Sequence, residues 1–424
     1  MPYQTQKQLA QTLAARLEGG PWTLDAIERG LRSRLPNEFH GAATDVAQHI
    51  FATFKQSYSP DTKRMAKFLT KQPMLGRLHA FCVKHDAWPS PWLQPPKMRP
   101  VATFEGLQIP QLATPLELAD WLMIPIEQLD HYVDRHGWRE EHNEMAMNHY
   151  FTHLSRKSSG GLRVIEAPKP RLKSFQRLIL QNILTHVPAH PDSFAFTSGR
   201  NCVDGAKRHA GAELVICFDL KDYFSSVQSG RIFGLFRCLG FPVAVARALT
   251  GLCTVVTPSR VRERLRFHKR QALRAPHLPQ GAPTSPALAN LVSFGLDRRL
   301  AGLARSLDGS YSRYSDDITF SGDASIHRAV QTAVPEIVRD EGFTLNAAKT
   351  RVMHARERQM ITWIVVNEKL NITRREFDRL KAVIHAKAWR DDPALSSRLL
   401  GQIGWVGQVN PAKAEKLRSL MARG

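Results

Sequence analysis

The chain has 424 residues, enough for two or three domains with sizeable cores, and its 59 Lys and Arg against 38 Asp and Glu give a net charge of +21. An excess of this size predicts a polyanionic partner, nucleic acid before membrane, with a generally basic protein as the alternative. No apolar run reaches the ~18 residues that span a bilayer, and scattered cysteines without a CxxC pair argue against a disulfide framework or a zinc site, so we expect a reduced, cytoplasmic protein that does not bind membranes.

Residues 1–105 carry helical patterns without a strand-rich core and end in a proline-dense segment from Trp88 to Pro100. Proline fixes φ and removes a backbone donor, so this segment is expected to be a stiff connector at a domain boundary. Residues 106–145 are expected to form a helical docking segment, because their apolar spacing resembles a packed helix pair. No chemistry follows from the first 105 residues.

A basic segment is interrupted by Gly160 and Gly161, which predict a two-residue hairpin turn. Lys157 and Arg163 would lie on this β-ribbon, where flexible cations suit a triphosphate that must enter and leave. We therefore treat them as candidate nucleotide-binding residues. An exposed basic hairpin without such a role is the alternative.

A continuous apolar run at residues 214–218 is typical of a strand buried on both faces. Asp219 ends this run, and an acid in that position is unfavourable unless it is paired or bound to a metal. Asp222 follows and is expected to be solvated or to cap a helix.

Two features of the middle of the chain suggest nucleic-acid contacts. The basic run from Arg260 to Arg274 predicts a phosphate-tracking loop, with a merely solvated loop as the alternative. Further on, Ser285 as N-cap and Pro286 as first helical residue predict a helix start. Gln280 and Gly281 lie just ahead of it, where backbone without a Cβ can approach a base or sugar closely.

The stretch from Tyr311 to Gly322 alternates apolar and polar residues on both sides of Asp316 and Asp317, which predicts a tight hairpin. Two adjacent carboxylates repel each other unless a cation lies between them, and an Asp-rich turn is the alternative interpretation. Phe343 and Leu345 predict a further strand, followed by Lys349.

Folding the buried strand beside this hairpin would bring Asp219, Asp316 and Asp317 together. Hard carboxylate oxygens favour two Mg²⁺ ions, with Mn²⁺ as a substitute. Such a pair activates an attacking 3′-hydroxyl and stabilises a leaving pyrophosphate, and this chemistry needs no Ser or Cys nucleophile.

Four motifs occur in a diagnostic order: Phe218-Asp-Leu-Lys-Asp-Tyr-Phe-Ser225, Leu278-Pro-Gln-Gly-Ala-Pro-Thr-Ser-Pro286, Tyr314-Ser-Asp-Asp317 and Gly342-Phe-Thr-Leu-Asn-Ala-Ala-Lys-Thr350. From about Tyr150 onward the chain therefore resembles reverse transcriptases, and more closely those of the bacterial retron type. The resemblance implies an α+β fold, a right-hand polymerase with an antiparallel palm sheet. Residues 146–366 would be fingers and palm, and 367–424 a helical, basic thumb.

The resemblance also implies roles for single residues. Asp219, Asp316 and Asp317 would be the metal carboxylates. Lys349 would protonate the leaving pyrophosphate or touch the triphosphate, with a plain surface lysine as the alternative. The residues implied to contact the nucleotide are Leu220, Phe224, Gln280 and Gly281, and Phe224 would exclude a ribose 2′-hydroxyl.

Two elements that help retron enzymes recognise their RNA depart from the family pattern. Residues 205–209 end in His209 but lack the expected Asn, and Ile361-Thr-Trp363 lacks the expected Gly, although Asn367 follows as in retrons. The candidate RNA-binding residues are Arg200, His209, Asn367, Arg374, Arg375 and Lys381.

The expected function is therefore RNA-directed DNA polymerisation of retron type, in which dNTPs are added on a bound structured non-coding RNA to give an RNA–DNA hybrid and single-stranded DNA. The family implies anti-phage defence with a companion effector protein. Two alternatives remain: another bacterial defence or group II intron-like reverse transcriptase not primed from a retron RNA, and a catalytically silent RNA-binding scaffold.

Overall fold

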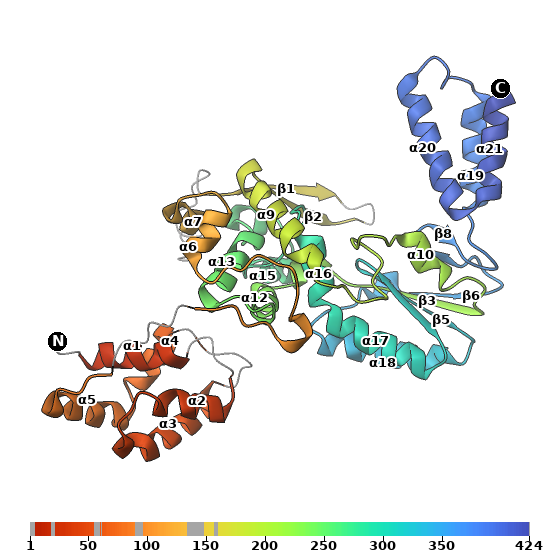
Figure 1. Ribbon diagram of the computed structural model, residues 1–424. Coiled ribbons are helices and arrows are strands. Elements are labelled where there is room, and N and C mark those ends of the chain that lie inside the picture. Colours follow the sequence, from red (N-terminus) through yellow and green to blue (C-terminus); the bar gives the residue numbers. More distant parts are fainter. Residues whose placement is uncertain are drawn as a thin grey trace. The chain divides into compact units, whose positions relative to one another are not determined.

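The computed structural model describes residues 5–17, 22–54, 60, 62–89, 96–133, 148–156 and 160–423, and the chain divides into two compact units (Figure 1). The first unit contains residues 1–105, 111–130 and 236–249. The second contains residues 106–110, 131–235 and 250–424. No described helix is both long and apolar enough to cross a membrane.

The first unit is helical over its described residues, as expected for the N-terminal extension. Its helices between residues 6 and 85 pack their apolar faces into one core, in which Leu13, Leu31 and Leu78 are fully buried. The Oγ1 of Thr23 caps one of them by accepting a hydrogen bond from the Ala26 N–H at 3.2 Å. The helices are α1 (Gln6–Leu17), α2 (Leu24–Arg32), α3 (His40–Thr53), α4 (Thr62–Leu69), α5 (Pro73–His85) and α6 (Pro115–Trp121), and three more, α7 (Ile126–Val133), α12 (Ser229–Cys238) and α13 (Val243–Cys253), have residues in both units.

A four-stranded antiparallel sheet organises the second unit, in the order β4-β5-β3-β6. The strands are β3 (Leu214–Asp219), β4 (Ser310–Tyr314), β5 (Asp317–Gly322) and β6 (Arg351–His354). Every residue of β3 is buried, as the continuous apolar run predicts. The predicted hairpin is confirmed as β4 and β5, but its two-residue tip is Ser315 and Asp316 instead of the two acids, because Asp317 pairs with Tyr314 as the first residue of β5.

The sheet is covered on both faces, because successive side chains of a strand point to opposite sides. In β4, Tyr311 and Arg313 bond Asp297 of α17 (Phe294–Ser306), whereas Ser312 between them bonds His209, just after α10 (Cys202–Lys207). Helix α18 (Ile326–Asp340) packs beside α17 and β5 (Figure 1). The sheet is therefore held in register from both faces.

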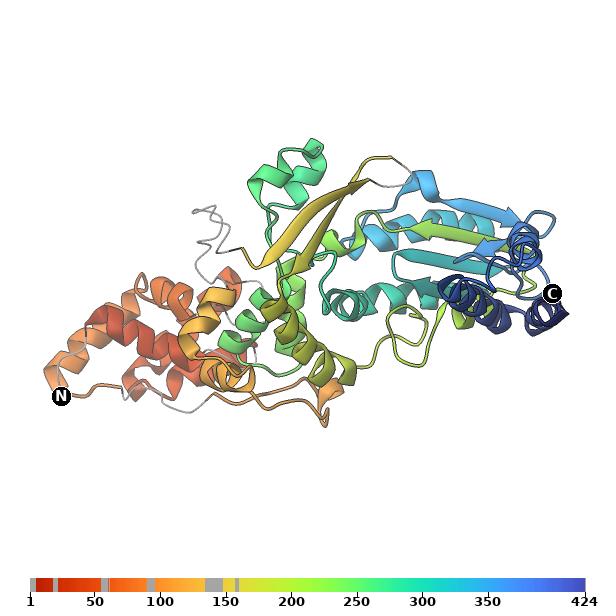
Figure 2. The same cartoon turned by 90° about the horizontal axis from the view of Figure 1, so that it is seen from above.

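The predicted basic hairpin is present, but its turn is longer than expected. Strands β1 (Tyr150–Arg156) and β2 (Leu162–Pro168) form a two-stranded ribbon, coloured yellow in Figure 2. Arg156 pairs with Leu162, so the connection spans residues 157–161 and the two-residue turn predicted from Gly160 and Gly161 is wrong. Both glycines have positive φ, which a loop of this kind requires. Helix α9 (Pro170–Asn182) follows.

Three local predictions in this unit need correction. The basic run folds into two short helices, α14 (Ser259–Arg262) and α15 (Phe267–Ala272), instead of a loop. Helix α16 (Ser285–Val292) begins at Ser285, so Thr284 is the N-cap residue; the Ser285 hydroxyl donates to the Pro279 carbonyl instead. Asp222 precedes the short α11 (Tyr223–Ser226) without a side-chain cap, because its carboxylate pairs with Lys269 at 3.1 Å.

The segment before β6 is less regular than predicted. Phe343 and Leu345 do not form a strand; Leu345 makes only an isolated bridge to Leu220, and Ala347–Lys349 is a short 3₁₀ turn. After β6 come β7 (Met360–Ile361) and β8 (Ile364–Val365). The chain then forms the predicted C-terminal helices, α19 (Arg374–His385), α20 (Pro393–Val409) and α21 (Pro411–Arg423), whose apolar faces share a core with one face of β3.

Candidate active site

The three predicted acids meet at one end of the sheet. Asp219 is the last residue of β3 and lies directly opposite Asp317, the first residue of β5. The Leu220 N–H donates to the Asp316 carbonyl at 2.9 Å, so the hairpin tip is bonded to the chain just after β3. Asp219 is only 6% exposed, whereas Asp317 reaches solvent. Antiparallel pairing thus brings together acids that are remote in sequence.

A cation already lies on this cluster. The ammonium Nζ of Lys349 is 2.6 Å from Oδ1 of Asp219, and the Asn346 side-chain amide donates to Oδ2 at 3.2 Å. The hydrogen bond to Asp219 raises the pKa of Lys349, and the charges of Asp316 and Asp317 act in the same direction. The predicted lysine therefore points at the acids.

Crowding of negative charge is visible in the two hairpin acids. Although Asp317 reaches solvent, partial desolvation by the surrounding chain raises its pKa to about 6, assisted by the charges of Asp316 and Asp219. Burial, together with Asp219, also raises the pKa of Asp316. Carboxylates that are crowded and partly desolvated in this way are stabilised by an added cation, and their oxygens are the ligands that Mg²⁺ and Mn²⁺ prefer. Among the described residues, no three Asp, Glu, His or Cys side chains are arranged as a metal-binding site. The cation that contacts Asp219 is the ammonium of Lys349.

The candidate nucleotide-binding residues differ in how far they are exposed to solvent. Arg163 is exposed on β2, and Lys157 lies outside the described residues. Leu220 is only 1% exposed, so its side chain belongs to the core, and the nucleotide contact implied for this residue stays a prediction for its backbone. Phe224 is half-buried in α11, and its ring lies 6.3 Å from that of Phe196, which is 52% exposed.

The Gln280–Gly281 turn is fixed by the β-ribbon. The Glu166 N–H of β2 donates to the Gln280 carbonyl at 2.9 Å. Gly281 has φ of +133°, and a Cβ there would lie 3.1 Å from the Glu166 carbonyl oxygen. The glycine is therefore required by its close approach to β2, a reason that the sequence did not reveal, while the Gln280 side chain remains partly exposed.

The RNA candidates fall into two groups, the first of which serves the fold. His209 is fully buried, with Nδ1 and Nε2 each 2.7 Å from a serine hydroxyl, those of Ser321 and Ser312. Burial lowers its pKa to about 3, so the imidazole is neutral and lies inside the fold, away from any surface that RNA could touch directly. The Asn367 amide donates to two carbonyls of the 355–357 turn, and Arg200 donates to the carbonyls of His190 and Ser193.

The second group lies on α19 and is open to solvent. Arg374 and Arg375 are exposed, and the Arg374 side chain is 94% exposed although it lies 3.6 Å from Asp378. Lys381 also pairs with Asp378, at 3.3 Å. Such exposed pairs are weak and exchange readily for other anions. This surface is therefore available to a phosphate backbone.

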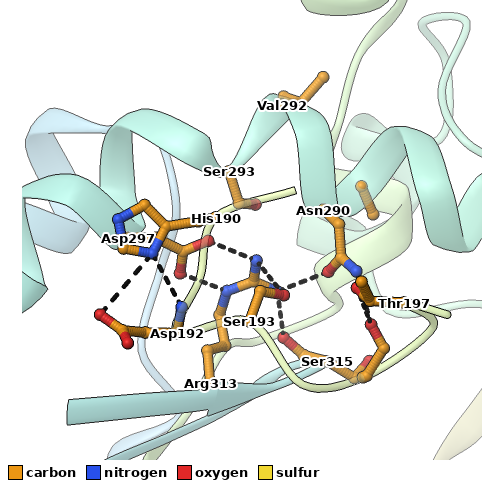
Figure 3. A network of polar contacts seen from close by, with 12 residues as sticks. His190, Asp192, Ser193, Thr197, Asn290, Val292, Ser293, Asp297, Arg313 and Ser315 are labelled. Atoms are coloured by element: carbon orange, nitrogen blue, oxygen red, sulfur yellow. Dashed lines mark hydrogen bonds and ion pairs between the residues drawn. The ribbon is translucent and has the colours of Figure 1, made fainter. Parts of the chain in front are cut away.

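A buried arginine beside the hairpin tip was not predicted from the sequence. Arg313 is 0% exposed, and its Nε and Nη2 donate to the two carboxylate oxygens of Asp297 at 2.7 Å each (Figure 3). Burial alone would lower the pKa of Arg313, but the Asp297 charge more than offsets this and raises it. The alternation of β4 was a usable signal, because it puts Arg313 on the same inward face as Tyr311.

Comparison with known proteins identifies the family. Residues 155–387 match the family described as "Reverse transcriptase (RNA-dependent DNA polymerase)". The chain is 39% identical over 312 residues to the retron Mx65 reverse transcriptase of Myxococcus xanthus, covering 73% of this chain and 71% of that protein. It is 34% identical over 304 residues to the retron Mx162 enzyme of the same organism, covering 66% and 62% respectively.

A third relative extends the comparison beyond that organism. The chain is 33% identical over 227 residues to the retron Ec86 reverse transcriptase of Escherichia coli, covering 53% of this chain and 65% of that protein. It thus spans slightly less than two thirds of the second and third relatives. The β3–β6 sheet corresponds to the antiparallel palm expected from the sequence. The chain belongs to the reverse transcriptases, the RNA-directed DNA polymerases, and within that family to the retron type.

Proposed function

We propose that this protein copies part of a bound, structured non-coding RNA into single-stranded DNA by metal-dependent nucleotidyl transfer. One observation carries the proposal: the register of β3 on β5 sets Asp219 opposite Asp317 and bonds the chain after Asp219 to Asp316. Three hard-oxygen side chains on rigid strands are what phosphoryl transfer requires, because its catalysis consists mainly of positioning and charge neutralisation.

The donor set fits divalent cations. Asp219, Asp316 and Asp317 would hold them, and the ammonium of Lys349 marks where positive charge is already stabilised. Two bound Mg²⁺ ions, for which Mn²⁺ can substitute, would activate the primer hydroxyl and stabilise the leaving pyrophosphate. Lys349 would then be released from Asp219 toward the triphosphate, where its 52% exposed side chain has room to move.

Other residues of the chain would bind and select the incoming dNTP. Arg163 presents an exposed cation on the β-ribbon, suited to a triphosphate, and Lys157 would add a second. Phe224 would press against the sugar and exclude a 2′-hydroxyl, since its half-buried ring is fixed in a short helix just after Asp219. The partly exposed Gln280 would contact the base or sugar from its turn.

The RNA and the RNA–DNA hybrid would be held by charge. Helix α19 supplies cations for the phosphates from Arg374, Arg375 and Lys381. The net charge of +21 on the whole chain also favours a polyanion such as RNA. Membership of the retron type suggests that the RNA is a structured non-coding RNA. DNA synthesis would start from a 2′-hydroxyl inside that RNA. A companion effector would couple synthesis to anti-phage defence.

A second candidate is a related reverse transcriptase that is not primed from a retron RNA. The β7–β8 turn favours it, because Trp363 replaces the expected glycine there, has φ of +71° and is 83% exposed. The RNA-recognition surface therefore departs from the family pattern at that point. This candidate shares the polymerase chemistry and differs only in the template.

The deciding experiment is to purify the protein from its host and sequence the RNA and DNA that accompany it. Retron-type synthesis predicts one abundant RNA encoded near the gene, with DNA complementary to part of it and joined to it. DNA of unrelated or untemplated sequence would overturn the retron-type template while leaving the polymerase assignment in place. Absence of any associated DNA, also from overexpressing cells, would support the silent scaffold.

A further inference from the structure

The buried Arg313 holds the turn that carries two of the acids. Its Nη1 donates to the Ser315 carbonyl at 2.9 Å (Figure 3). Ser315 has φ of +60°, a left-handed conformation that costs a non-glycine residue about 1 kcal/mol and persists only where the surroundings enforce it. The next residue is Asp316, whose own carbonyl accepts the Leu220 N–H. The backbone on both sides of Asp316 is therefore fixed.

The same guanidinium reaches two further elements of this unit. Nη1 also donates to the Tyr223 hydroxyl at 2.9 Å and to the Asn290 side-chain oxygen at 3.0 Å. Tyr223 directly precedes Phe224 in α11. Asn290 in α16 extends the hydrogen-bond network to a further segment. Its side-chain amide donates to the carbonyl of Ala195, the residue before Phe196, at 2.6 Å. One side chain thus links the hairpin tip to both aromatic residues near it.

Stability alone does not account for this arrangement. A buried ion pair is often replaceable by apolar residues of similar volume without loss of stability, because desolvation of the charges offsets their attraction. An apolar pair could fill the space of Arg313 and Asp297, but it could not donate to the Ser315 carbonyl. Catalytic groups must be held within about 0.5 Å of their working positions, which an unsupported left-handed turn would not ensure.

We propose that Arg313, oriented by Asp297, is a positioning residue for nucleotide addition. It sets Asp316 and Asp317 at the hairpin tip and fixes Tyr223, and through it Phe224, relative to them. Arg313 touches neither substrate nor metal in this role, and it acts through the backbone it bonds. The inference rests on the proposed function, because it takes these acids as catalytic.

The first test replaces Arg313 with lysine. Arg313→Lys keeps a positive charge for Asp297 but lacks the planar fork that reaches several acceptors at once. We expect kcat for dNTP addition to fall about 10²-fold, as for a misplacement of about 1 Å, with the KM for dNTP changed less than about threefold. Hydrogen exchange at the Leu220 amide should become faster, because that amide reports on the tip.

A matched control and a second variant separate positioning from folding. Tyr311→Phe removes a hydrogen bond to the same Asp297 carboxylate without touching Ser315, so kcat should stay within about threefold of wild type. If Arg313→Lys does not fold, the paired change Arg313→Met with Asp297→Leu, which leaves no unpaired buried charge, is used instead. It should fold, show fast Leu220 exchange and retain the low kcat.

The outcomes are distinct. Folded variants with unchanged kcat and unchanged Leu220 exchange would overturn the positioning role. A loss of kcat in Tyr311→Phe as large as in Arg313→Lys would also overturn it, since any damage to this cluster would then suffice. If wild-type protein adds no nucleotide at all, the proposed function fails, and Leu220 exchange still decides whether Arg313 sets the tip.

Discussion

The ammonium of Lys349 lies 2.6 Å from Oδ1 of Asp219, the acid that stands opposite Asp317 on the neighbouring strand. This relationship joins two of the four family motifs in one contact. The three acids repel one another, and the lysine supplies the positive charge that offsets part of that repulsion. A divalent ion entering the cluster would have to compete with it.

That competition predicts an unusual pair of effects for Lys349→Met. Mn²⁺ measured by electron paramagnetic resonance should bind about three- to tenfold more tightly, because a nearby positive charge is gone. Nucleotide incorporation should nevertheless fall by about 10- to 100-fold, because the proton donor or triphosphate contact is lost. Lys369→Met, which removes an exposed lysine, is the control. Weaker Mn²⁺ binding in Lys349→Met would contradict competition at Asp219.

The buried His209 predicts how stability depends on pH. Its pKa is lowered from 6.5 to about 3 in the folded protein, so between these values the unfolded chain binds a proton that the folded chain does not. Stability is therefore full above pH 6.5 and is lost as pH falls toward 3, by a few kcal/mol. Urea unfolding across this range should show a flatter profile for His209→Gln.

An exposed histidine provides the comparison for that profile. His385 at the end of α19 is open to solvent, so His385→Gln should leave the slope between pH 3 and 6.5 as in wild type. An identical slope in His209→Gln would mean that the imidazole is not held neutral between Ser312 and Ser321.

Selection against ribonucleotides should depend on Phe224. Replacing it with alanine removes the half-buried ring beside Phe196 and opens space for a 2′-hydroxyl. Discrimination between dNTP and rNTP, measured as the ratio of kcat/KM, should decrease about 10- to 100-fold. Phe51→Ala, which removes an exposed ring from α3, should not change it. Unaltered discrimination in Phe224→Ala would place the sugar elsewhere.

Glycines in two helices should respond oppositely to alanine. At Gly404 in α20 a Cβ would meet nothing within 4 Å, whereas at Gly251 in α13 it would lie 2.6 Å from the Val133 carbonyl oxygen. Gly404→Ala should raise the free energy of unfolding by about 0.5–1 kcal/mol, since alanine restricts the unfolded chain and favours helix. Gly251→Ala should lower it. Urea titration measures both, and destabilisation by Gly404→Ala would indicate a contact that is not seen here.

The acids could be found from the sequence because Asp219 ends a strand and Asp317 begins one, each with a strong local pattern, and Asp316 lies in the turn beside Asp317. Asp219 follows an unbroken apolar run, and Asp316 and Asp317 interrupt an alternating one. Their proximity then required only antiparallel pairing of two strands. The pattern of each strand also sets how the strands pair, because a sheet that is covered on both faces has a fixed register.

Features that depend on tertiary contacts could not be found in this way. Arg313 and Asp297 lie on different elements, and no local sequence pattern predicts that they form a buried ion pair. His209 looked like an RNA ligand by its place in a family element, but its contacts come from two strands more than a hundred residues away. The length of the β1–β2 turn likewise depended on which residues pair across the ribbon.

Primer extension on an RNA template tests the central claim most directly. The full chain is given dNTPs and Mg²⁺, and wild type is compared with Asp316→Asn and Asp317→Asn, each checked for folding by its thermal transition. We predict extension by wild type that chelation of Mg²⁺ abolishes, and a loss of at least about 10³-fold in either variant, because each removes a charge from the cluster. Folded variants that add dNTPs at the wild-type rate would contradict the account.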